Sequence, residues 1–249
     1  MTAKVAHIWH HPIKSHGREE LSEVSLTEGK CLPWDRYWAV AHERSCFDIS
    51  NPRWQPCSEF SRGAKSPRLQ AISIHMDHHA KKLTVSHPDR VDLTFDPETQ
   101  GPEFIQWVMP VSNGSRLLPA QLVRSAQAMT DTDFPSVSLI NMATHRAVES
   151  RLGRGISPLR WRGNFLLEGL EPLVENDWIG KKLRLGGAEI EIREPIGRCK
   201  ATTANTDTGE RDADTLEALR TGFGNLDMGV YGVVTKSGEV RQGDSLVLV

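Results

Sequence analysis

The stretch Lys181–Arg193, KKLRLGGAEIEIR, has the pattern of a β-hairpin. Two leucines alternate with charged residues before Gly186-Gly187, and two isoleucines alternate with charged residues after it. A Gly-Gly pair supplies the positive φ angles that a two-residue hairpin turn requires. Alternation with a period of two gives each arm one apolar and one charged face. The stretch therefore predicts an antiparallel sheet with one face on a hydrophobic core.

Short segments of the same kind recur along the chain, separated by Gly, Pro and His residues. They predict strands at Val5–Trp9, Glu23–Leu26, Tyr37–Ala41, Ala71–Met76, Leu83–Ser86, Val91–Phe95 and Ser245–Val249. The segment His42–Pro67 is polar and irregular, and we expect it to form a long loop.

The sequence predicts few helices. Asn141 is placed to cap one at Met142–Leu152, and an Asp and a Glu three residues apart form a capping box for another at Thr215–Arg220. A short third helix is expected at Glu103–Val108. Many short strands with few helices indicate an α+β, predominantly β fold with barrel-like sheets. Since neither βαβ alternation nor a G-x-G-x-x-G or G-x-x-x-x-G-K-[ST] motif occurs, a nucleotide-binding sheet is not expected.

A length of 249 residues allows one large domain or two small ones. The stretch Pro110–Pro119 carries Gly, Pro and Ser residues and follows the first set of strands. It predicts a boundary between an N-terminal domain, residues 1–110, and a C-terminal domain, residues 111–249.

The composition argues against several classes of protein. With 30 Lys and Arg against 32 Asp and Glu, the net charge of −2 does not suit a nucleic-acid binder with a general basic field or a polybasic membrane anchor. No stretch approaches the roughly 18 apolar residues of a membrane helix, and the first residues lack the apolar core of a signal peptide. The four cysteines form no C-x-x-C pair, so we expect a protein of the reducing cytoplasm.

Cys199 lies in the polar stretch EPIGRCKATTAN. Arg198 beside it favours the thiolate, and two threonines and Asn205 place hydroxyl and amide groups nearby. A thiolate is a ligand for soft or high-valent metals and also a nucleophile, whereas a structural cysteine usually packs among aliphatic residues. The local sequence leaves all three roles open.

Three basic spots lie far apart in the sequence. They are Lys14-Ser15, Asp35-Arg36, and Arg162 with Asn164. A cation beside a hydroxyl or amide in a loop at a strand end suits phosphate or another oxyanion. Isolated cations at strand ends are more often solvated, and Asp35-Arg36 also fits an internal ion pair.

The histidines form two groups. His75, His78 and His79 suggest zinc, but they fall at a turn and two are adjacent, so a solvated turn is the better interpretation. His10 and His11 flank the first basic spot, and either is a candidate to line a site. No G-x-S-x-G elbow is present to seat a serine nucleophile.

Five segments, taken in order, resemble motifs of the MOSC family, in the branch that carries an N-terminal β-barrel extension and includes the amidoxime-reducing components. The segments are His11-Pro12-Ile13-Lys14-Ser15, Trp34-Asp35-Arg36-Tyr37-Trp38, Trp161-Arg162-Gly163-Asn164, Arg198-Cys199 with Thr202-Thr203 and Thr208-Gly209, and the run from Val230-Tyr231-Gly232 to Gly243-Asp244. The resemblance covers most of the chain. It implies a MOSC-type β-barrel preceded by an N-terminal β-barrel-like domain.

The resemblance also implies a molybdenum cofactor, molybdenum bound to molybdopterin, with Cys199 as the metal ligand. The residues that it implies for cofactor binding are Lys14, Ser15, Arg36, Arg162, Asn164, Arg198 and Cys199, with Ser136 added from a less closely matching segment. Trp34 stands where the family usually has glycine and Gly163 where it often has proline, and these departures bear on the substrate range.

The implied activity is the reduction of N-hydroxylated compounds, such as hydroxylamines and amidoximes, by oxygen transfer to molybdenum. Cys199 is then the catalytic metal ligand, and either Asn205 or His10 is a candidate to line the pocket. Electrons are expected from a separate flavin, ferredoxin or cytochrome-type protein, with no nucleic-acid or membrane partner. Two other classes stay open: a cofactor carrier or sulfur-transfer protein with a Cys199 persulfide, and a non-catalytic binding module.

Overall fold

The computed structural model describes residues 3–112 and 117–249. Its strands are β1 (Lys4–His10), β2 (Glu19–Leu21), β3 (Glu23–Leu26), β4 (Trp38–His42), β5 (Ser73–Asp77), β6 (Lys82–His87), β7 (Arg90–Phe95), β8 (Pro119–Arg124), β9 (Val137–Asn141), β10 (Phe165–Glu168), β11 (Lys182–Leu185), β12 (Ala188–Gly197), β13 (Asp227–Lys236), β14 (Gly238–Arg241) and β15 (Leu246–Leu248). Its α-helices are α1 (Gly101–Val108), α2 (Met142–Leu152) and α3 (Thr215–Phe223). The fold is therefore α+β and predominantly β, which confirms the predicted class.

The predicted hairpin is β11–β12, with its turn at Gly186-Gly187. Leu183 pairs with Ile190, and both side chains are fully buried. Gly186 has a φ of +57°, and a Cβ there would lie 2.9 Å from the carbonyl oxygen of Glu239, so the turn requires glycine. Beyond the hairpin, β12 continues to the residue that precedes Arg198 and Cys199.

The largest sheet has eight strands in the order β15-β11-β12-β13-β9-β10-β1-β2. All neighbours in it are antiparallel except β9 and β10, which run parallel. Both of these strands were missed by sequence analysis, because their residues are buried on both faces and show no alternation.

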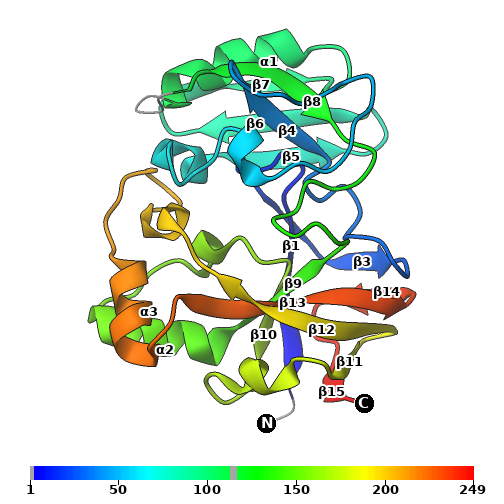
Figure 1. Ribbon diagram of the computed structural model, residues 1–249, viewed down its shortest axis with the longest axis vertical. Coiled ribbons are helices and arrows are strands. Elements are labelled where there is room, and N and C mark those ends of the chain that lie inside the picture. The colour runs from blue at the N-terminus through cyan, green and yellow to red at the C-terminus, as the bar shows by residue number, and fades with distance from the viewer. Residues whose placement is uncertain (1–2, 113–116) are drawn as a thin grey trace.

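Two lobes lie one above the other in Figure 1. The upper lobe holds α1, the pair β4–β8 and the three-stranded sheet β5-β6-β7, and the lower lobe holds the eight-stranded sheet with α2 and α3. β1 and β2 belong to the lower sheet, and β3 pairs with β14. Residues 113–116 of the expected boundary stretch lie outside the described residues, and the division into 1–110 and 111–249 stays a prediction.

The helices agree with the expected positions, and α2 has the expected bounds. The Asn141 side chain accepts a hydrogen bond from the amide of Ala143 at the start of α2. Asp214 likewise accepts from the amide of Glu217 at 3.0 Å. Within the described part of the chain, no helix is long and apolar enough to cross a membrane.

The segment between β4 and β5 is mostly irregular, as predicted. It holds only two short 3₁₀ turns, Cys57–Glu59 and Pro67–Ala71, in residues 43–72. Phe60 of this segment is buried in the upper lobe against Ala39 and Ala41 of β4. The loop is thereby fixed to the upper lobe.

Candidate functional site

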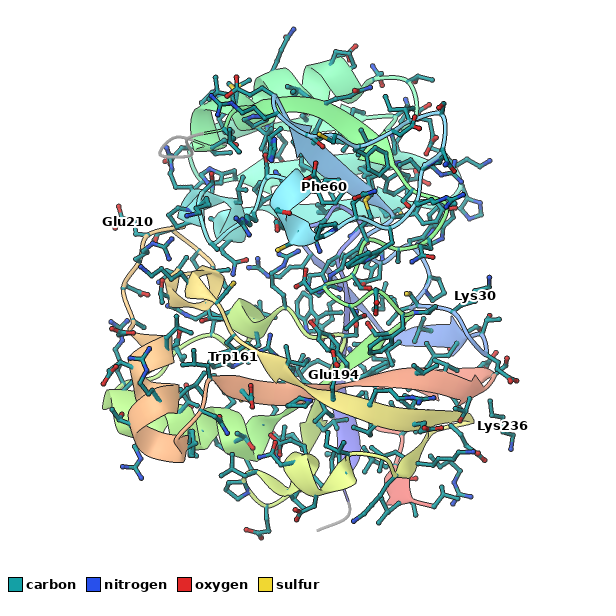
Figure 2. The ribbon with its side chains drawn as sticks, viewed as in Figure 1. Lys30, Phe60, Trp161, Glu194, Glu210 and Lys236 are labelled. Carbon is teal, nitrogen blue, oxygen red and sulfur yellow. The ribbon has the colours of Figure 1, made fainter. Side chains whose placement is uncertain are left out.

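A cavity of about 350 Å³ lies between the two lobes, and most of the predicted site residues line it. These residues are Lys14, Ser15, Arg36, Arg162, Arg198 and Cys199. They come from segments more than 180 positions apart in the sequence, and the fold brings them to one wall. Figure 2 shows two further wall residues, Trp161 and Glu194, in the lower lobe near its junction with the upper lobe.

Cys199 is exposed and lies just beyond the end of β12. A 3₁₀ turn, Lys200–Thr203, follows it, and the Thr202 hydroxyl donates to the Cys199 carbonyl at 3.0 Å. That hydroxyl also contacts the Thr215 hydroxyl at 2.6 Å. The threonines near the cysteine therefore hold its backbone, and the thiol is left open to the cavity.

Arg198 is held by backbone oxygens. Its Nη1 donates to the Trp161 carbonyl at 2.7 Å, and its Nε donates to the Met228 carbonyl at 2.8 Å. No carboxylate of the described residues forms an ion pair with it. Burial lowers the pKa of Arg198 to about 10. The guanidinium is thus fixed in direction with its charge uncompensated.

The guanidinium of Arg162 is likewise bonded only to uncharged oxygens among the described residues. Its Nη2 donates to the Gly17 carbonyl at 3.1 Å and its Nη1 to Gln70 Oε1 at 3.5 Å. Burial, together with the nearby charges of Arg36 and Arg18, lowers the pKa of Arg162 to about 9. An anion in the cavity would relieve this repulsion.

Lys14 and Arg36, in contrast, each have a carboxylate partner. Lys14 Nζ donates to the Met129 carbonyl at 2.8 Å and to Asp131, and Arg36 donates to Asp35. Although burial alone would raise it, the pKa of Asp131 is lowered to about 2, mainly by Lys14. The alternative that Asp35-Arg36 is an internal ion pair is correct, and Arg36 lines the cavity as well.

Three wall residues have an unusual backbone. Ser15, Arg36 and Arg162 have φ angles of 64°, 52° and 50°. Residues other than glycine and asparagine rarely adopt this left-handed backbone conformation, and backbone strain of this kind is concentrated at functional sites. No signal in the sequence marks these positions, because none of the three residue types favours that conformation.

Asn164 and Ser136 are not part of the cavity wall. Asn164 is buried, and its Oδ1 accepts from the amide and the hydroxyl of Ser138 at 3.0 and 2.8 Å. Because Ser138 lines the cavity, Asn164 supports the wall from behind. The Ser136 hydroxyl contacts the Thr132 hydroxyl at 2.8 Å.

The candidate histidines and Asn205 lie elsewhere. His10 contacts Glu19 at 2.8 Å, and His11 contacts the buried carboxylate of Asp35 at 3.1 Å. Asn205 donates to Asp212 at 2.9 Å. His75 lies on β5 rather than in the turn, and no three His, Cys, Asp or Glu side chains of residues 3–112 and 117–249 are grouped for a metal ion.

Sequence analysis missed several wall residues. They are Cys57, Arg62, Asp131, Arg160, Glu194 and Tyr231. Tyr231 pairs with Glu194 in the β12–β13 ladder, and burial raises the pKa of its phenol to about 12. It therefore stays protonated at neutral pH as a hydrogen-bond donor. The family-like run at Val230-Tyr231-Gly232 was the one available signal for it.

The donor set fits an anionic pterin cofactor with one thiolate metal ligand. Arg162 and Arg198, which form no ion pair with a carboxylate of the described residues, need a negative group, which a phosphate supplies. The exposed thiol of Cys199 in the same wall is the only sulfur ligand besides Cys57 that the described wall offers. A metal there would need most of its ligands from the cofactor itself.

Comparison with known proteins gives matches along nearly the whole chain. The MOSC N-terminal beta barrel domain matches residues 2–111, and the MOSC domain matches residues 128–247. The mitochondrial amidoxime-reducing component 1 of Mus musculus is 21% identical over 98% of this chain and 82% of its own length. A molybdenum cofactor sulfurase of Anopheles gambiae is 28% identical over 48% of this chain and 18% of its own length.

Among solved structures, the YUAD protein from Bacillus subtilis aligns with a TM-score of 0.49 at 13% identity, covering 99% of this chain and 94% of that one. The two domain matches stand in order and leave only short stretches of the chain unmatched. The chain therefore belongs to the MOSC family, in the branch that carries the N-terminal β-barrel domain.

Proposed function

We propose that this protein is a molybdenum-cofactor-dependent oxidoreductase that reduces N-hydroxylated compounds such as hydroxylamines and amidoximes. One observation carries the proposal: the exposed thiol of Cys199 shares a cavity with Arg162 and Arg198, which have no carboxylate partner in the described chain. Similarity to an amidoxime-reducing component over 98% of the chain supports the reaction class.

Different residues of the cavity would hold different parts of the cofactor. Cys199 would ligate the metal, and Lys14, Ser15, Arg36 and the two unpaired arginines would bind the pterin and its phosphate. When bound, the cofactor would supply the two-electron chemistry that cleaves the N–O bond of the substrate. Because Arg198 is fixed by two carbonyl oxygens, its guanidinium needs little reorganisation when the anion enters.

Electrons would come from a separate flavin, ferredoxin or cytochrome-type protein. All four cysteines are free, which supports a reducing compartment such as the cytoplasm.

Cofactor content tests the proposal. The wild-type protein and Cys199→Ala would be produced in a host that makes the cofactor, and molybdenum and pterin would be measured in both. We expect near-stoichiometric molybdenum in the wild type, lowered retention in the variant, and reduction of benzamidoxime by the wild type only, with a reduced viologen as electron source. Wild-type protein that stays empty in a host that loads other molybdenum enzymes would overturn the proposal.

A second candidate function is cofactor sulfuration or carriage with a persulfide on Cys199. The similarity to a molybdenum cofactor sulfurase over 48% of the chain favours it, as does the exposure of the thiol. Mass spectrometry separates the two functions, because a persulfide adds the mass of one sulfur to the Cys199 peptide. That mass without N-reduction would favour the second function.

A further inference from the structure

Arg62 is a cation of the cavity wall that lies outside every motif with which the sequence resembles the family. Its Nη1 lies 3.4 Å from Cys57 Sγ, a weak acceptor. Within residues 3–112 and 117–249, no carboxylate oxygen lies within 4.0 Å of its guanidinium nitrogens. The side chain is half-buried, so its charge is only partly solvated.

The backbone around Arg62 is held firmly. Its carbonyl accepts hydrogen bonds from the amides of Lys65 and Ser66, both at 3.0 Å. Phe60, two residues earlier, is 1% exposed in the upper lobe. The arginine therefore projects from an anchored turn.

This turn is joined to the segment that carries Cys199. A Cβ on Gly63 would lie 3.4 Å from the Cβ of Ala201, two residues after the cysteine. Arg211 donates to the Ala64 carbonyl at 2.9 Å and to the Thr203 hydroxyl at 2.6 Å, and so ties the two segments together. Arg62 and Cys199 consequently lie on adjoining segments of one wall.

Each of the other cations of the wall has either a carboxylate partner or a proposed ligand. Lys14, Arg36 and Arg160 have carboxylate partners, and Arg162 and Arg198 would hold the anionic cofactor. Arg62 remains as a planar donor with two nitrogen edges, a shape that matches a carboxylate. A single guanidinium balances the single charge of that group.

We propose that Arg62 binds a carboxylate on the N-hydroxylated substrate and thereby selects an anionic substrate class. The inference rests on the proposed function. It makes the loop Cys57–Ser66, which the upper lobe anchors, the part of the cavity that determines specificity.

Three related compounds test the inference: benzamidoxime, its 4-carboxylate and the methyl ester of that carboxylate. The holoenzyme would be assayed at pH 7 with a reduced viologen, and the quantity of interest is the ratio of kcat/KM for the carboxylate to that for the ester. We expect the carboxylate to be preferred, and Arg62→Gln to lower the ratio about tenfold, the effect of one charge-assisted hydrogen bond.

Lys65→Gln is the matched control. Lys65 lies three residues away, is exposed and is absent from the cavity wall. Its substitution changes the net charge of the protein by the same amount as Arg62→Gln and should leave the ratio unchanged. A ratio near one in the wild type, or an unchanged ratio in Arg62→Gln, would overturn the inference. Loss of molybdenum from Arg62→Gln would also overturn it, because Arg62 would then be a cofactor ligand.

Binding of the carboxylate and the ester to the oxidised holoenzyme, measured by calorimetry, separates this inference from the proposed function. Turnover of all three compounds without selectivity would overturn the inference and leave the function in place. Selective binding of the carboxylate without turnover of any amidoxime would overturn the function and restrict Arg62 to anion binding.

Discussion

Arg160 and Arg162 are two residues apart and line the same cavity, but the protein holds them differently. Arg160 is 2% exposed, and it donates to Asp212 at 2.6 Å and to the Thr203 carbonyl at 3.1 Å. Arg162 is half-buried and contacts a carbonyl and an amide oxygen, with no ion pair in the described part of the chain.

The difference indicates two uses of the same residue type. An arginine with a carboxylate partner joins segments of the chain, here the 3₁₀ turn Pro158–Trp161 and the loop around Asp212. An uncompensated arginine next to other cations destabilises the native state, and a protein keeps it where a ligand supplies the missing charge. Function is therefore expected at the corner of the cavity formed by Arg162, Arg198 and Cys199.

The largest effect is expected at that corner. Cys199→Ala should abolish reduction of benzamidoxime, because the metal loses its protein ligand. The thiol is exposed, so the free energy of unfolding in urea should change by no more than about 0.5 kcal/mol. Cys46→Ala, an exposed thiol outside the cavity wall, should keep both activity and stability. Activity retained by Cys199→Ala would contradict the assignment of function to this corner.

When a buried cation loses its carboxylate partner, we expect a loss of stability. Asp35 is 0% exposed, and it accepts from the His11 amide at 2.7 Å and from Arg36. Asp35→Asn leaves the Arg36 charge buried without a partner, and we expect a loss of about 3–5 kcal/mol in the free energy of unfolding. A loss below about 1 kcal/mol in urea denaturation would show that Arg36 behaves like the unpaired arginines.

The uncompensated charge also acts on His16. Burial is the main cause that lowers the pKa of His16 to about 4, from an ordinary value of 6.5, and Arg162 lowers it further. Between pH 6.5 and 4 the unfolded chain binds the proton and the folded protein does not, so stability falls as the pH falls through this window. The contribution amounts to about 3 kcal/mol. His16→Gln should flatten the pH dependence of the unfolding free energy between these values, and an unchanged slope would refute the assignment.

The smallest effects are expected when Arg160 and Arg162 are each substituted and the stabilities of the two variants are compared. The proteins would come from a host that lacks the cofactor. Arg160→Gln removes the hydrogen bonds to Asp212 and to the Thr203 carbonyl and should cost about 1.5–3 kcal/mol, although Asp212 keeps its contacts with Arg154 and Asn205. Arg162→Gln removes an uncompensated charge and should cost less than about 1 kcal/mol. Inorganic phosphate should raise the Tm of the wild type and not that of Arg162→Gln. Equal losses in the two variants would remove the distinction between paired and unpaired arginines.

Much of the local structure could be predicted. The hairpin β11–β12 follows from alternation around Gly186-Gly187, and α2 follows from its cap at Asn141, since both signals involve residues close in the sequence. β9 and β10 were missed because burial on both faces removes the alternation that marks a strand.

At the site, too, some features could be predicted from the sequence and others could not. The sequence by itself determined the class of fold, and its motifs pointed to Cys199 and to the cations that line the cavity with it. Only the tertiary structure decided which cations are paired: Lys14 meets Asp131 across 117 positions of sequence, and Arg62 enters the wall from a loop without a motif. A charge partner from a distant segment has no periodicity or spacing to mark it, because packing of the two lobes alone brings the groups together.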